Sequence, residues 1–571
     1  MGFDHDTQVS RRLGASKSRA GCKTCKIRRV KCDEIKPCCR RCSSTGRHCQ
    51  YEGARYPAAP STPSPTGLIL SRNLSQSPNS GQRERRAFEY YFQHAAHYLS
   101  GGLGVNFWTL VVPQICRSEP AVWDAMIAIS ALYEYPDQCL DFHFLRKQYD
   151  QTQSMNRNSR EALNWYSRSM SSVRSQIERG NADPYISLIS CVLFICIETI
   201  QGRVEEALQL YRQGVQLILD LRVQVALDRV SVSKAALLEH TLIPLFLRLG
   251  NVSLTVSGTQ PSELYRTTEK KVSSSFSSVD SARAAIVLLS AEAMIFEGES
   301  TIYLRSVDGD HAISADMIEK KKSLSGRLSR WLVGYTSLCD RLRTKYAIPT
   351  ATEPILLAYH ASASIVVTGC LTQLQTVYDV HSADFSLIIE QTSLTLNASA
   401  GPGGSQPPFT FEMGTGIPLA VTVMKCRDPV LRRKALALLK KAPPVQGFFK
   451  CTPVALLAEN LMKLEEGYSL DSKKAAQSSL LNISPGSNQF ASLAVSQHEV
   501  TPNNSPCIPE EARISGYAIF KPRNGLLPGI KEEHITRWGR SSDHLFLQFT
   551  RNRFDKASVT WKSYSECVPL G

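Results

Sequence analysis

Residues 21–50 read GCKTCKIRRVKCDEIKPCCRRCSSTGRHCQ, and this stretch decides the fold at one end of the 571-residue chain. Seven of the 17 cysteines lie here, whereas the other ten are scattered singly. Six of the seven form a repeat, in which Cys22-x2-Cys25-x6-Cys32 is followed by Cys39-x2-Cys42-x6-Cys49. Two cysteines separated by two residues can direct both sulfurs at one metal ion. The repeat therefore predicts two half-sites for metal.

The number of sulfurs limits how the metal is held. Two separate tetrahedral zinc sites need about eight bonds, and six thiolates supply them only if two sulfurs bridge both ions. By symmetry, Cys22 and Cys39 are the expected bridges, and an all-thiolate cage suits two zinc ions. Cys38 would break the repeat as a ligand, so we expect it to be a spare. A disulfide knot and an iron–sulfur cluster are weaker alternatives, because no secretory signal precedes the repeat and its doubled spacing is specific.

Positive charge is concentrated around the same cysteines. Residues 11–55 hold 14 Lys or Arg and 3 Asp or Glu, a formal charge of +11 out of +15 for the chain. Six thiolates and two zinc ions add −2, which leaves about +9 on the loaded segment. A local patch of this kind predicts a polyanionic partner, nucleic acid first and an anionic membrane second. Because such a short segment cannot bury a hydrophobic core, metal binding must supply its folding energy.

The residues between the second and third ligands predict a recognition element. Residues 26–31, KIRRVK, are expected to form a short helix whose orientation the metal fixes. Ile27 and Val30 would share a face and pack on the cluster. Arg28, Arg29 and Lys31 would then point toward a groove, where an arginine can bond guanine through two atoms.

The stretch CKTCKIRRVKCD followed by KPxCxxC resembles the fungal six-cysteine binuclear zinc cluster transcription factors. The resemblance implies that Cys22 and Cys39 bridge two zinc ions and that the helix enters the major groove of double-stranded DNA at CGG-like sites. It places Arg28 and Arg29 at the base-reading positions, where the family often has lysine. The other basic residues are better candidates for phosphate contacts: Lys23, Lys26, Lys31, Arg40, Arg41 and Arg47.

We assign residues 21–52 to the zinc cluster. The segments on either side of it are predicted to be disordered. Residues 1–20 form a short basic tail, and residues 53–86 are rich in serine and contain five prolines. This composition is typical of an extended tether and excludes the coiled coil that many relatives carry there. The protein is therefore expected to bind DNA as a monomer or to dimerise through its large body.

Long amphipathic patterns predict an all-α regulatory body over residues 87–470. The clearest helices are expected at 87–101, as three helices within 167–221, and at 428–443 with Asp428 as N-cap. The most apolar run, residues 188–200, is too short to span a membrane and contains Glu198, so it predicts a buried helix. Residues 471–510 read as a second, serine-rich linker. Alternation in 513–520 and 544–549 predicts a small β element within the C-terminal segment 511–571, with Trp538 and Trp561 anchoring it.

These features favour a nuclear regulator of RNA polymerase II transcription that binds DNA and coregulators but no membrane. The chain is not expected to be an enzyme, because it lacks a nucleophile elbow, a P-loop and a glycine-rich dinucleotide turn. The alternative is a zinc-dependent module that binds protein or RNA without duplex specificity. Among the gene sets that the family controls, secondary metabolism is slightly favoured.

Overall fold

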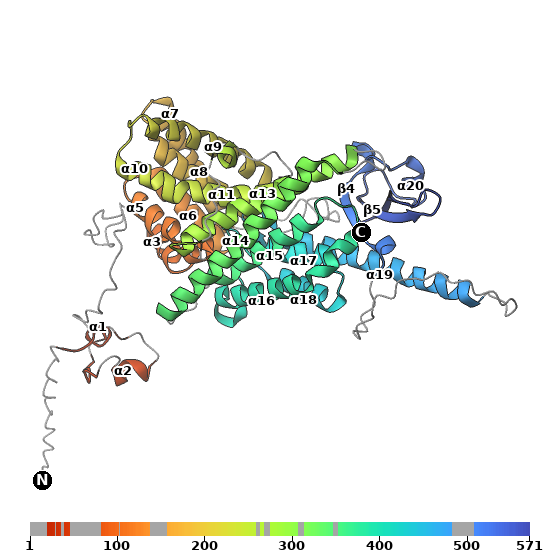
Figure 1. Ribbon diagram of the computed structural model, residues 1–571. Helices are drawn as coiled ribbons and strands as arrows, with labels where there is room; N and C mark the ends of the chain where they lie inside the picture. Colours follow the sequence, from red (N-terminus) through yellow and green to blue (C-terminus); the bar gives the residue numbers. More distant parts are fainter. Residues whose placement is uncertain are drawn as a thin grey trace, which may run out of the picture. The chain divides into compact units, whose positions relative to one another are not determined.

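The computed structural model describes residues 20–28, 30–35, 39–45, 49, 81–101, 103–136, 157–257, 263–267, 275–306, 313–345, 352–481 and 508–570. The chain divides into two units, Met1–Ser71 and Arg72–Gly571 (Figure 1). The predicted tail 1–20 lies outside the described residues except for its last residue. The predicted linker lies outside them up to residue 80.

The first unit contains two short helices, α1 (Lys23–Ile27) and α2 (Arg40–Ser43). Its core consists of five buried cysteines, with Val30 and Cys49 packed against them. Sulfur atoms thus occupy the place that apolar side chains occupy in a larger domain.

The second unit is mainly helical, as predicted. Its first half contains α3 (Gln82–Tyr90), η1 (Tyr91–Ala95), α4 (Ala96–Ser100), η2 (Phe107–Val111), α5 (Val112–Ile115), α6 (Pro120–Glu134), α7 (Arg157–Glu178), α8 (Pro184–Ile200), α9 (Val204–Ala226), α10 (Val232–Leu237), η3 (Leu238–Leu242), α11 (Ile243–Ser257) and α12 (Glu263–Thr267). Its second half contains α13 (Val279–Ser306), α14 (Ala315–Lys345), α15 (Thr352–Gly369), η4 (Gln375–His381), α16 (Ser382–Ser399), η5 (Pro402–Gly404), α17 (Gly416–Lys425), α18 (Pro429–Lys441) and α19 (Cys451–Leu481). Helix α3 starts before residue 87, and α19 continues past residue 470.

A large hydrophobic core runs through these helices, from Tyr91 to Met462, and a smaller one lies around α15, η4 and α16. The apolar run at 188–200 lies in α8 and is almost entirely buried, as predicted. Asp183 begins this helix by accepting a hydrogen bond from the N–H of Tyr185 at 2.8 Å, and Pro184 occupies its first turn. The three helices expected within 167–221 are α7, α8 and α9. Among the described residues, no helix has the length and apolar character needed to cross a bilayer.

The apolar spacing of residues 428–443 predicts a buried face made of Val430, Leu431, Ala435, Leu438 and Leu439, and the face that α18 buries differs from it. Asp428 caps the helix as expected, since its Oδ1 accepts from the N–H groups of Val430 and Leu431 at 2.9 and 2.8 Å. Val430, however, is 54% exposed, and Arg432 is buried instead. The prediction from apolar spacing was wrong here, because Glu465 neutralises the guanidinium of Arg432 and so allows it to be buried inside the body.

The body also contains a small sheet that the sequence analysis missed. Strands β1 (Phe409–Thr410), β2 (Val445–Gln446) and β3 (Phe449–Lys450) pair in the order β1-β2-β3. Strand β2 is parallel to β1 and antiparallel to β3. Each strand has only two residues, too few to show alternation in the sequence.

A second sheet follows the helices, which confirms the predicted β element. It consists of β4 (Ile514–Phe520), β5 (Phe546–Asp555) and β6 (Thr560–Pro569), antiparallel in the order β4-β5-β6, with η6 (Glu510–Ala512), η7 (Pro522–Asn524) and α20 (Glu532–Thr536) beside it. Strand β6 was not predicted from the sequence. The indole of Trp538 donates to the carbonyl of Cys567 at 3.2 Å, and Trp561 packs edge-on against Phe554.

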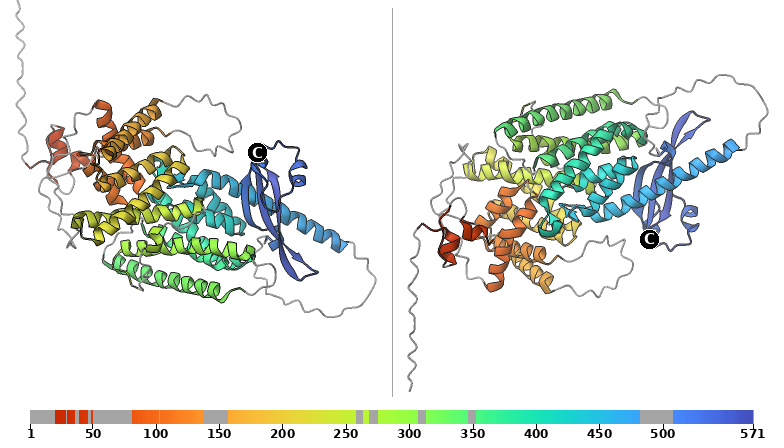
Figure 2. Two further views of the ribbon diagram at one scale, coloured as in Figure 1. Left: turned by 90° about the horizontal axis from the view of Figure 1, so that it is seen from above. Right: turned by 90° about the horizontal axis from the view of Figure 1, so that it is seen from below.

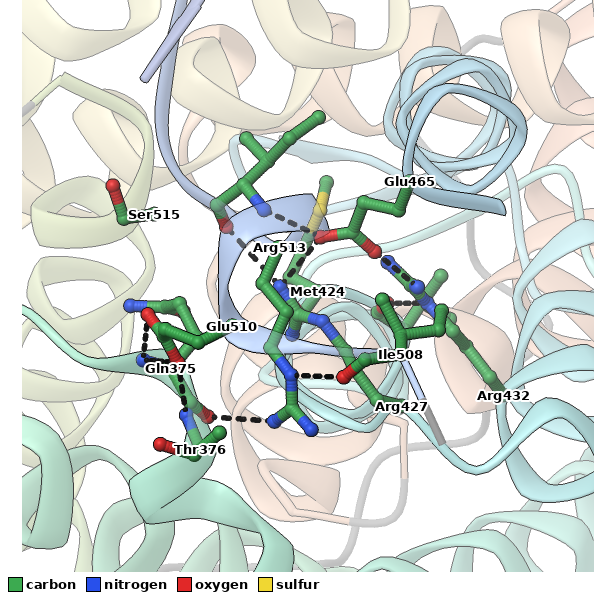
Figure 3. A network of polar contacts seen from close by, with 12 residues as sticks. Gln375, Thr376, Met424, Arg427, Arg432, Glu465, Ile508, Glu510, Arg513 and Ser515 are labelled. Carbon is green, nitrogen blue, oxygen red and sulfur yellow. Dashed lines mark hydrogen bonds and ion pairs between the residues drawn. The ribbon is translucent and has the colours of Figure 1, made fainter. Parts of the chain in front are cut away.

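Buried charges join this sheet to the helices, and Figures 1 and 2 show it lying beside α19. Glu510 accepts from the backbone N–H groups of Gln375 and Thr376 at 2.9 and 2.8 Å (Figure 3). Arg513, fully buried, forms two hydrogen bonds with Asp379, at 2.7 and 2.8 Å. Since these partners are far apart in sequence, they fix the position of residues 510–513 on the body.

Glu465 on α19 is the centre of the same network (Figure 3). Its carboxylate accepts from Arg427 at 2.7 Å, from Arg432, and from the N–H of Ile514 at 2.7 Å. Burial raises the pKa of Glu465, but the two arginines and the N–H outweigh burial and hold the pKa below its ordinary value. The carboxylate therefore stays charged inside the body.

We expect Glu465→Gln to lower the free energy of unfolding by about 3–5 kcal/mol at pH 7, because it leaves two buried guanidinium groups without a counter-charge. Glu466→Gln is the matched control. Glu466 pairs with Arg433 at the surface, and its loss should cost less than about 1 kcal/mol. Urea unfolding followed by circular dichroism measures both. Equal losses in the two variants would contradict the role given to Glu465.

Comparison of wild type with Glu465→Gln also tests how stability depends on pH. A folded-state pKa below the unfolded value stabilises the protein above the unfolded pKa, and this stability is lost as the pH falls through the folded pKa. The unfolded carboxyl titrates at about pH 4.3. Wild-type stability should therefore fall below about pH 4.3 more steeply than that of Glu465→Gln.

Candidate metal centre and nucleic-acid interface

The two halves of the cysteine cluster have the same backbone arrangement. Cys22 and Cys39 directly precede α1 and α2, with φ and ψ of −60° and 151° in the first and −69° and 147° in the second. The backbone nitrogen of Cys22 lies 3.4 Å from Sγ of Cys32, and that of Cys39 lies 3.3 Å from Sγ of Cys49. The repeat in the sequence is thus a repeat in three dimensions.

The six sulfurs form two overlapping groups of four. Within each group all sulfur atoms lie within 4.8 Å of one another: Cys22, Cys25, Cys32 and Cys39 in one, and Cys22, Cys39, Cys42 and Cys49 in the other. The groups share Cys22 and Cys39, whose Sγ atoms are 3.8 Å apart. A tetrahedral site with zinc–sulfur bonds of about 2.3 Å has edges of about 3.8 Å. The sulfurs therefore fit two zinc ions that share two thiolates.

The ionisation of the thiols agrees with this sharing. Burial raises the pKa of Cys25 to about 12, and it raises the pKa of Cys42 as well. Burial acts in the same direction on Cys22 and Cys39, but the N–H groups of Cys25 and Cys42 and the nearby thiols outweigh it, so that their pKa is lowered. Among Cys22, Cys25, Cys39 and Cys42, the two thiols with the lowered pKa are the two that both groups share. Zinc binds thiolates, so bound zinc would keep all of these sulfurs ionised.

Asp33 connects the two halves, a role that the sequence analysis missed. Its Oδ2 accepts from the N–H of Arg40 at 2.9 Å, at the start of α2, and its Oδ1 accepts from the N–H of Ile35 at 3.3 Å. A carboxylate at a helix N-terminus is favourable, since it satisfies an unpaired N–H group. The signal was an acidic residue directly after a ligand cysteine, but its partner is evident only in the folded unit.

The predicted recognition helix is shifted along the chain. Helix α1 covers Lys23–Ile27 and ends at Arg28, so it does not span 26–31. Val30 packs against the cysteines as expected, whereas Ile27 is 73% exposed. The prediction that Ile27 and Val30 share a helix face was wrong, because the helix starts at the Cys22 cap and stops before Val30. Helical spacing therefore does not relate these two residues.

The basic side chains surround the buried sulfurs. Those exposed to solvent are Lys23, Lys26, Lys31, Arg40 and Arg41. Arg28 is half-buried, and its NH1 group lies 3.4 Å from Oγ1 of Thr45, just beyond α2. The predicted base-contacting Arg29 and the predicted phosphate-contacting Arg47 lie outside the described residues. Metal ligands thus face inward in this unit, and positive charge faces outward.

Comparison with known proteins finds a family match in part of each unit. Residues 20–56 match the fungal Zn(2)-Cys(6) binuclear cluster domain, and residues 86–281 match the fungal specific transcription factor domain. The chain thus contains matches to two domains of fungal zinc cluster transcription factors, and curated relatives are named as such factors. Its cluster domain is one that binds two zinc ions.

Three relatives illustrate the similarity. The Zn(2)-C6 fungal-type transcription factor afumD of Aspergillus fumigatus is 34% identical over 129 residues, 21% of this chain and 34% of the relative. The aspercryptin biosynthesis cluster-specific transcription regulator atnN of Emericella nidulans is 27% identical over 280 residues, 43% of this chain and 41% of the relative. Sterol uptake control protein 2 of Saccharomyces cerevisiae is 51% identical over 45 residues, 8% of this chain and 5% of the relative.

The matched part of this chain thus spans between a third and about two-fifths of the length of the first two relatives. No solved structure matches the chain.

The role of each cysteine can be tested by counting zinc. Full-length protein should hold two zinc ions, measured by mass spectrometry of the released metal. Cys49→Ser removes a sulfur from one group and should retain about one ion, whereas Cys39→Ser removes a shared sulfur and should lose both. Cys38→Ser is the matched control and should keep two. Loss of zinc from Cys38→Ser but not from Cys39→Ser would reverse the assignment.

Proposed function

We propose that this protein is a nuclear regulator that binds specific double-stranded DNA sites and controls genes transcribed by RNA polymerase II. The observation that carries the proposal is the first unit, in which exposed lysines and arginines surround a buried thiolate cluster. A rigid, positively charged surface of this kind neutralises phosphates, and its affinity for DNA falls steeply with salt.

The basic residues divide into two roles in this proposal. Lys23, Lys26, Lys31, Arg40, Arg41 and Arg47 contact phosphates and set the position of the unit on the duplex. Arg28 and Arg29 read guanines of a CGG-like site. The contact between Arg28 and Thr45 supports this division, because it restrains Arg28 against the second half of the unit.

We further propose that the genes belong to a metabolic or secondary-metabolite biosynthetic set. A relative named for the aspercryptin biosynthesis cluster supports this choice. The helical body would then bind coregulators or a second copy of the chain. The second candidate is a zinc-dependent module that binds protein or RNA, and its support is the same exposed charge without the base-reading role.

DNA binding separates the two candidates. Zinc-loaded full-length protein should bind a duplex with a CGG site more tightly than a scrambled duplex. Arg28→Ala and Arg29→Ala should each cost about 1–3 kcal/mol on the CGG duplex and little on the scrambled one. Lys26→Ala should weaken both about equally and reduce the salt slope by about 1. Equal binding of both duplexes, or tighter binding of RNA, would favour the second candidate.

Chromatin occupancy of the tagged protein tests the function in the cell. Sharp peaks should share a CGG-containing sequence, and Cys39→Ser should abolish them because it disrupts both metal groups. Cys38→Ser should keep the peaks and controls for the loss of a thiol as such. The genes beside the peaks would identify the regulated set, and peaks that persist in Cys39→Ser would contradict a role for the cluster.

A further inference from the structure

The helical body contains a cavity of about 710 Å³. It is bounded by residues 103–107, by the end of η3 with the start of α11, and by the first turns of α13; α11 and α13 contact each other along the body (Figure 1). Part of its lining is apolar: Leu103, Val105, Phe107, Ile243, Leu247 and Val287. The rest is polar or charged, and there Arg222 is paired with Glu239 at 3.2 Å beside His240. A cavity of this size and character accommodates a small organic molecule.

A buried ion pair borders the cavity. Arg248 donates to Glu412 through Nε and through NH2, the latter at 2.8 Å, and both side chains are almost completely buried. Gly104 lies directly against this pair, since a Cβ atom at residue 104 would lie 2.3 Å from Oε1 of Glu412. The charge of Arg248 is thus neutralised within the protein.

Arg283, which also lines the cavity, is balanced much less well. Its NH1 group donates to the carbonyl of Leu103 at 2.9 Å and to Asp280 at 2.7 Å. The Arg283 side chain is only 14% exposed, whereas that of Asp280 is 82% exposed, so the counter-charge lies largely in water. Nε of Arg283 is buried and has no hydrogen-bond partner among the described residues. Burial lowers the pKa of Arg283 and Arg248 adds to this effect, whereas Asp280 and Glu412, which is already paired with Arg248, oppose it.

We propose that this cavity binds a small organic carboxylate with an apolar body. The carboxylate accepts hydrogen bonds from the Arg283 guanidinium and supplies the buried negative charge that Asp280 does not, while the hydrocarbon packs on the apolar walls. A phosphate fits less well, because its second charge would find Arg248 already neutralised by Glu412. The ligand would contact three segments that are far apart in sequence and hold them together.

Calorimetric titration of zinc-loaded full-length protein with 2-naphthoate, and separately with neutral 2-naphthamide, tests the proposal. The two probes share an aromatic body and differ in charge. Wild type should bind one naphthoate per chain, at least tenfold more tightly than naphthamide. Arg283→Met should remove this preference by weakening naphthoate at least tenfold while changing naphthamide little.

Ala284→Trp provides a second variant that leaves the core intact, since Ala284 lines the cavity but is itself exposed. Its indole should fill the space and abolish binding of both probes. Ala437→Trp, at an exposed alanine on α18 away from the cavity, is the matched control and should bind as wild type does. Equal affinity of wild type for the two probes, absence of naphthoate binding at millimolar concentration, or unchanged binding in Ala284→Trp would overturn the proposal.

Discussion

Six sulfurs held within a few ångströms of one another are the constraint on which the first unit depends. Buried thiols resist ionisation, as the raised pKa of Cys25 shows, and so short a segment has no apolar core to hold them together. Two divalent ions remove both difficulties, since they neutralise the thiolates and tie them to one another. The surface is then free to carry uncompensated positive charge, because folding does not depend on it.

The second unit solves the same problem of buried charge without metal. Its helices enclose a large apolar core, and several buried charges are paired within the protein: Glu465 with two arginines, Arg513 with Asp379, and Arg248 with Glu412. Such pairs contribute little net stability compared with apolar packing, but losing one partner is costly. They therefore specify which segments meet more than they stabilise the body as a whole.

Local patterns predicted most of the fold. The cysteine spacing, the apolar run of α8 and the Asp428 cap each reflect contacts within a few residues, and the structure has them where expected. The failures involve distant partners. Ile27 is exposed because the helix starts at the Cys22 cap and ends before Val30. Arg432 is buried because its charge is neutralised by Glu465, 33 residues further along the chain. Asp33 and Arg283 acquire their roles in the same way, from groups that no local pattern identifies.

The contacts of residues 510–514 bear on the order in which the body is completed during synthesis. Glu465 receives one of its hydrogen bonds from Ile514, and the N–H groups of Gln375 and Thr376 find their acceptor in Glu510. Glu510 and Ile514 are translated only after every helix from α3 to α19. The helical body therefore stays incompletely bonded until translation has passed residue 514. A truncated transcript that ends before that point yields a protein in which Glu465, Gln375 and Thr376 lack these hydrogen bonds. Such a product is more open to proteolysis.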